Sequence, residues 1–190
     1  MHHAIAAWSE ELYSTDNFIS PLDFNLHYKI PFNGIQSFLE TSPSILESHG
    51  IGMSALIKHL TKTYGNNIVG KFFNGLKTNP NALEVILDTL NYVYNTPESI
   101  WWPNFFKEYI SGNIYNVQGD KFLNNITKTI EFNDGDTLKH IDETYKDLSA
   151  KLFRININST DTKNNKSLNF KLGPSSLNLD YVKVLVFGIS

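Results

Sequence analysis

One histidine, His49, stands in a context that suits chemistry on a carbonyl group. It lies in Ser48-His49-Gly50-Ile51-Gly52, where two glycines permit close approach to the backbone. A strongly helical stretch follows, and the positive end of that helix would disfavour protonation of the imidazole. A neutral imidazole there could donate a hydrogen bond to a developing oxyanion. The simpler interpretation, that His49 fills a turn and caps the helix, stays open.

Two adjacent carboxylates, Glu10 and Glu11, follow Trp8 and could act in acid–base chemistry if one of them were buried. Neighbours in sequence point to different sides of a helix, so a paired role is disfavoured and at least one carboxylate should face solvent. We therefore take His49 as the candidate catalytic residue, and Trp8, Glu10 and Gly52 as candidate binding residues.

The spacing of the histidines predicts no metal site. The six histidines include no H-E-x-x-H pair, and the chain contains no cysteine. His2 and His3 stand at the start of the chain, as the remnant of an affinity tag would. We expect no metal ion or other cofactor to be bound by this chain alone.

Aromatic side chains offer a different chemistry, the stacking of sugar rings. Five of them could serve as platforms if they are exposed: Trp101, Trp102, Tyr92, Tyr94 and Tyr115. Aromatic residues at helical spacing more often belong to a core. A carbohydrate-binding module is therefore the alternative interpretation.

Composition narrows the class of protein further. The 190 residues are 41% hydrophobic and 18% charged, with a net charge of −3. This is a globular composition, and the absence of a basic patch argues against a nucleic-acid partner. No apolar run approaches the roughly 18–20 residues that cross a bilayer, and no signal peptide is recognisable. We expect no membrane partner.

The elements that must position these residues fall into two parts, residues 1–125 and 126–190. In the first part, five stripes of apolar residues at helical spacing predict short helices. The stripes are Ile5, Trp8 and Leu12; Met53, Leu56, Ile57, Leu60 and Tyr64; Ile68, Phe72, Phe73 and Leu76; Leu83, Ile86, Leu87 and Leu90; and Trp102, Phe105, Phe106 and Tyr109. Gly65 and Gly112 should end two of them. Asn67 should cap one, and Pro80 and Pro97 should lie in or at the first turn of two others.

Beyond residue 125 the pattern alternates as in strands. The predicted strands are centred on residues 151–157, 168–172 and 182–187, with a hairpin loop at 159–166 and a turn at 173–176. We therefore predict an α+β fold, a bundle of short helices followed by a small antiparallel sheet.

A succession of short motifs resembles a known family. It consists of residues 4–11, which contain A-x-W-S-E-E, then residues 48–60, Tyr64-Gly65, and Trp102-Pro103-Asn104-Phe105-Phe106. Over residues 4–112 the chain resembles the helical C-terminal half of the catalytic domain of gluzincin zinc metallopeptidases, the aminopeptidase N-like and thermolysin-like group.

The resemblance implies roles for single residues. His49 falls where the family places a Tyr or His that stabilises the oxyanion, and Gly52 falls on the glycine that follows. The family's zinc-binding Glu would fall at His3, which is not a carboxylate. The H-E-x-x-H helix would lie upstream of Met1, so we expect zinc only together with such a segment.

Three hypotheses about function follow. The first is a zinc-less fragment or degenerate relative of a metallopeptidase, inactive alone, which binds a peptide or the missing N-terminal portion of the peptidase domain. The second is a non-enzymatic cell-surface or carbohydrate-binding module. The third is a structural domain whose apolar surface is covered by the missing N-terminal portion. The compartment stays open, although the resemblance favours an extracytoplasmic or cell-surface location.

Overall fold

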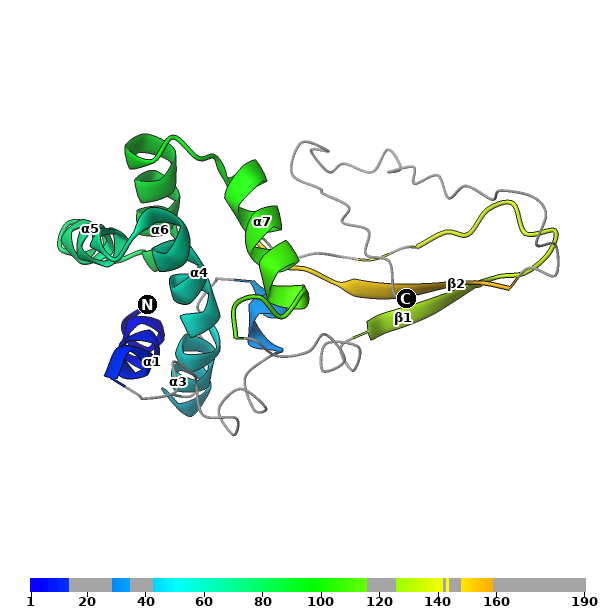
Figure 1. Cartoon of the computed structure of the whole chain (residues 1–190), viewed down its shortest axis with the longest axis horizontal. Coiled ribbons are helices and arrows are strands. Elements are labelled where there is room, and N and C mark those ends of the chain that lie inside the picture. Colours follow the sequence, from blue (N-terminus) through cyan, green and yellow to red (C-terminus); the bar gives the residue numbers. More distant parts are fainter. Residues whose placement is uncertain (14–28, 35–42, 116–125, 142, 144–147, 159–190) are drawn as a thin grey trace.

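The structure, a computed structural model, describes residues 1–13, 29–34, 43–115, 126–141, 143 and 148–158. Its elements are, in chain order, α1 (His2–Tyr13), η1 (Ile30–Asn33), α3 (Pro43–Gly52), α4 (Ser54–Tyr64), α5 (Asn67–Leu76), α6 (Ala82–Asp88), the π-helical turn η2 (Thr89–Val93), α7 (Glu98–Ile110), β1 (Ile126–Phe132) and β2 (Leu152–Ile157). The helices gather at one end of the molecule and the two strands extend away from them (Figure 1). The fold is therefore α+β and mostly helical, as predicted.

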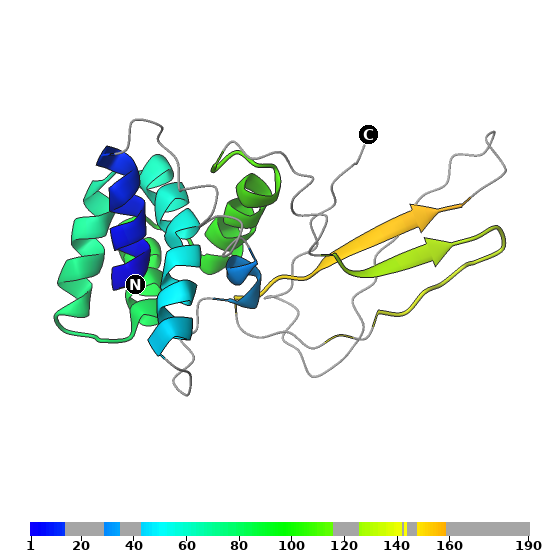
Figure 2. The ribbon, with the colours of Figure 1, turned by 90° about the horizontal axis from the view of Figure 1, so that it is seen from below.

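Helix α4 is the centre of the helical part. Its stripe of Leu56, Ile57 and Leu60 is at most 2% exposed, because α1, α3, α5 and α7 all pack against it. Figure 2 shows α1 lying beside α3 and α4, seen from below. Amphipathic helices of this length are marginal alone, so their stability comes from this mutual packing.

The ends of the helices only partly follow the predictions. Gly65 ends α4 with a φ of 84°, a value that glycine adopts without strain, and Gly112 follows α7 with a φ of 75°. The predicted cap at Asn67 is wrong: Asn67 is the first residue of α5, and Asn66 holds the N-cap position. Pro80 also lies outside the first turn of α6, because Asn81 caps that helix.

Asn81 shows why the cap lies one residue beyond the proline. Its side chain accepts hydrogen bonds from the backbone N–H groups of Leu83 and Glu84. These groups have no partner within the helix, so an Asn side chain at this position stabilises the first turn. Pro97 likewise holds the N-cap position of α7 rather than the first turn.

Helix α7 contributes a dense aromatic core. Trp102 stacks on Phe105 with ring centroids 5.2 Å apart, and Phe105 stacks on Tyr109 at 5.5 Å. These rings are 8% exposed or less, so the helical spacing of the aromatic residues predicted their burial correctly. Burial of one such ring stabilises the folded state by roughly 1.5–3 kcal/mol.

The sheet corrects the prediction of an antiparallel arrangement. Strands β1 and β2 are parallel, with Ile130 opposite Ile155 and Phe132 opposite Ile157. Alternation of apolar and polar residues reports that a segment is a strand but carries no information on its direction. Strand β2 was predicted and β1 was not, while the predicted strands at 168–172 and 182–187, the hairpin loop at 159–166 and the turn at 173–176 lie outside the described residues.

The start of β2 is attached to the helices. The backbone N–H of Ala150 donates to the carbonyl of Phe32 in η1 at 3.1 Å, and the ring of Phe32 contacts that of Tyr109 at 6.1 Å. Leu148 joins the helical core. The described helices lie before residue 116 and the described strands after residue 125, but a division into two domains at residue 125 stays a prediction.

Candidate functional site

His49 does not lie in a turn before a helix, as the sequence suggested. It belongs to the last turn of α3, and its side chain is only 8% exposed. Its backbone carbonyl accepts a hydrogen bond from Met53 at 3.0 Å, which continues the helical turn. The argument for a neutral imidazole assumed that the positive, N-terminal end of a helix lies next to His49. Because His49 lies in the last turn of α3, the positive end of α3 does not act on it.

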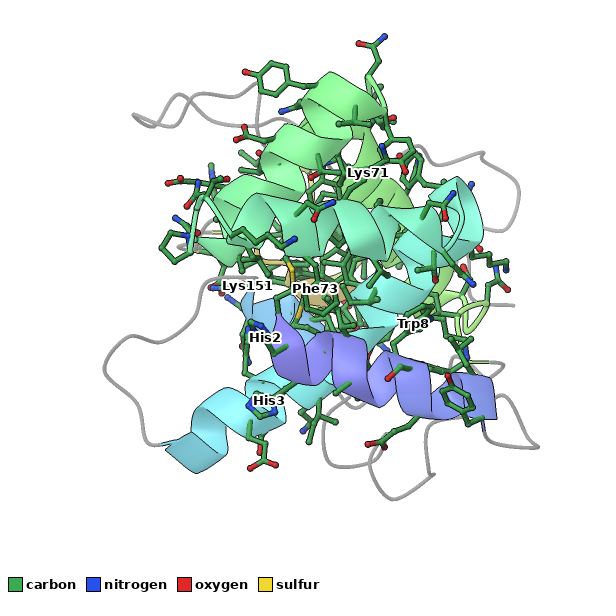
Figure 3. The ribbon with its side chains drawn as sticks, turned by 90° about the vertical axis from the view of Figure 1, so that its left-hand side faces the viewer. His2, His3, Trp8, Lys71, Phe73 and Lys151 are labelled. Carbon is green, nitrogen blue, oxygen red and sulfur yellow. The ribbon has the colours of Figure 1, made fainter. Side chains whose placement is uncertain are left out.

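The glycine beside His49 serves the packing of two helices. A Cβ atom placed on Gly50 would lie much closer to the Cβ of His3 than real Cβ atoms come to their neighbours. The prediction of close backbone approach is thus confirmed at Gly50, but the approaching group is α1. Figure 3 shows His3 on the side of α1 that faces α3.

The two histidines at the start of the chain are part of α1 and contact other helices. His3 packs on Gly50, and the ring of His2 lies edge-on to that of Phe73 with centroids 5.9 Å apart (Figure 3). Both residues therefore contact neighbouring helices, while their origin in an affinity tag stays a prediction.

The candidate binding residues do not converge on one surface. Trp8 is 7% exposed and belongs to the hydrophobic core, on the face of α1 that meets the other helices (Figure 3). Glu10 is exposed and Gly52 is buried. The two-residue offset between Trp8 and Glu10 places them on different sides of α1, so Glu10 does not join Trp8 at the buried face.

No group of three or more His, Cys, Asp or Glu side chains that could hold a metal ion occurs in the described ranges. Nor does any helix in these ranges combine the length and hydrophobicity that crossing a membrane requires.

The predicted sugar platforms divide into two sets. Trp101, Trp102 and Tyr115 are at most 8% exposed, so they belong to the core and cannot stack on a ligand from solvent. Tyr92, by contrast, is 84% exposed on the π-helical turn η2. Tyr94 is half-buried.

Tyr94 joins three elements at the surface. Its ring contacts that of Tyr64 at the end of α4, with centroids 4.7 Å apart, and the ammonium group of Lys71 on α5 lies 5.8 Å from its ring centre. Sequence reasoning missed Tyr64 and Lys71 as neighbours of Tyr94, because the contact depends on how α4, α5 and η2 pack.

A hydroxyl pair with a nearby cation was also missed. The Oγ atom of Ser54 and the Oη atom of Tyr115 are 3.0 Å apart, and the Nζ atom of Lys58 lies 4.5 Å from the centre of the Tyr115 ring. Such groups can activate a serine hydroxyl, but a nucleophile must also reach its substrate. Ser54 is 0% exposed, so this arrangement bonds α4 to the segment after α7 rather than presenting a nucleophile.

His59, on α4, is a second buried histidine. It is 8% exposed, and its ring lies 5.7 Å from that of Phe105 on α7. Burial lowers the pKa of His59 below its ordinary value, and the nearby charge of Lys62 adds to this, while Glu108 acts in the opposite direction. The signal that could have revealed its burial is its position four residues after Ala55 and three after Leu56, on the same side of the helix as these two core residues.

Comparison with known proteins assigns no family to this arrangement. No protein-family model, no curated protein and no solved structure matches the chain.

Proposed function

We propose that this chain is a non-catalytic binding lobe, related to the helical half of a gluzincin peptidase. The placement of His49 carries the proposal. A residue that stabilises an oxyanion must present its N–H group to the substrate, whereas His49 is 8% exposed and lies in the last turn of α3.

The binding part of the proposal comes from the resemblance. In such peptidases the helical half forms one side of the substrate cleft, so the expected partner is a peptide or the N-terminal portion of a peptidase domain. Any zinc would then be bound by residues of that portion. Exposed apolar side chains on the helices are compatible with a partner, as Phe73 on α5 is 40% exposed and Ile100 on α7 is 50% exposed.

A cleavage assay tests the non-catalytic part. The purified chain is incubated with a mixture of fluorogenic peptides in the presence of added Zn²⁺, and we expect no hydrolysis above the protein-free blank. Hydrolysis that a chelator abolishes would contradict the proposal.

The variants His49→Ala and His140→Ala are compared in the same cleavage assay. His49 is buried and His140 is exposed. If hydrolysis were observed and only His49→Ala lost it while still folded by circular dichroism, His49 would be catalytic after all.

A carbohydrate-binding module is the second candidate, and the exposure of Tyr92 favours it. A ring that is 84% exposed on a short π-helical turn can present its face to a sugar. Turns of this kind frequently occur at functional sites. Three of the five proposed platforms are buried, so this candidate now depends on Tyr92 and Tyr94.

A glycan array with matched variants tests this candidate. Tyr92→Ala should weaken binding up to about tenfold, since an aromatic contact contributes roughly 0.5–1.5 kcal/mol. Tyr13→Ala is the control, because Tyr13 is 89% exposed on α1, a different element. An array without hits for the unaltered chain, or equal loss in both variants, would remove the candidate.

A further inference from the structure

We draw no further inference here: the strongest candidate, the surface around the exposed Tyr92 and the half-buried Tyr94, which lies beside Tyr64 and Lys71 where η2, α4 and α5 meet, belongs to the carbohydrate-binding alternative already described, and nothing in the structure shows what covers it.

Discussion

His59 lies between α4 and α7, where a positive charge is unfavourable. Because burial disfavours the imidazolium form, the pKa of His59 is lower in the folded chain than in the unfolded chain, where it is near 6.5. Above that pH both states hold a neutral ring. As the pH falls below it, the unfolded chain binds a proton first, so the free energy of unfolding decreases.

The pH dependence of stability should therefore contain a contribution from His59. We expect the free energy of unfolding, measured by denaturant titration at about pH 7.5 and pH 5.5, to fall less with acidification in His59→Gln than in the unaltered chain. His140→Gln, which changes an exposed histidine, is the matched control. Identical pH dependence in His59→Gln and the unaltered chain would show that His59 does not titrate as described.

The burial of a single residue could be predicted where the residue belongs to a helical spacing of apolar residues, and could not be predicted elsewhere. The helical spacing of Trp8 and Trp102 favoured the core, where both lie, although Trp8 was also a candidate binding residue and Trp102 a candidate sugar platform. Leu12, in the same stripe as Trp8, is 51% exposed. His49 was misjudged because a glycine beside a histidine has two uses, a flexible turn or a close helix contact. The sequence does not distinguish these uses, since the contact partner, His3, lies far away along the chain.

At the scale of elements, the contact of α1 with α3 depends on Gly50. A methyl group at this position would meet His3 at the Cβ atom, which cannot rotate away, so one helix must move. Gly70 on α5 offers the opposite case, because a Cβ there meets nothing within 4 Å. The two glycines are both helical and differ in what surrounds them.

Replacing Gly50 or Gly70 with alanine should have opposite effects on the free energy of unfolding. Gly50→Ala should lower the free energy of unfolding by about 1–3 kcal/mol, because the strain exceeds the helix propensity gained. Gly70→Ala should raise it by roughly 0.5–1 kcal/mol, since alanine favours the helix and meets no neighbour. Chemical denaturation of both variants measures this difference. Equal stability of the two variants would mean that α1 does not pack on α3 as closely as described.

Helices were more predictable than strands for a physical reason. The stripe of α4 repeats over three turns and Gly65 ends it, so its existence and its end could both be derived. Strand β1 was missed although Ile130 and Phe132 alternate with Thr129 and Glu131, because Lys128 interrupts the apolar row. The direction of β2 relative to β1 depends on the course of the chain between residues 133 and 151, so it is not encoded within one strand.

In the molecule as a whole, the helical core encloses most of the candidate site, which therefore lacks access from solvent. The side chains of His49 and Trp8 are buried, and that of Glu10 is exposed. The proposed relation to gluzincin peptidases adds a second argument, because the family's zinc-binding Glu would fall at His3, which is not a carboxylate. The proposal of a binding lobe follows from these two observations together.

The zinc content of the purified chain tests this central claim most directly. The chain is loaded with excess Zn²⁺, desalted in the presence of a weak chelator and measured by mass spectrometry of the metal. We predict far less than one zinc ion per chain, because three protein ligands are needed for a catalytic site. One tightly bound zinc ion per chain, with accompanying cleavage of peptides, would contradict the claim.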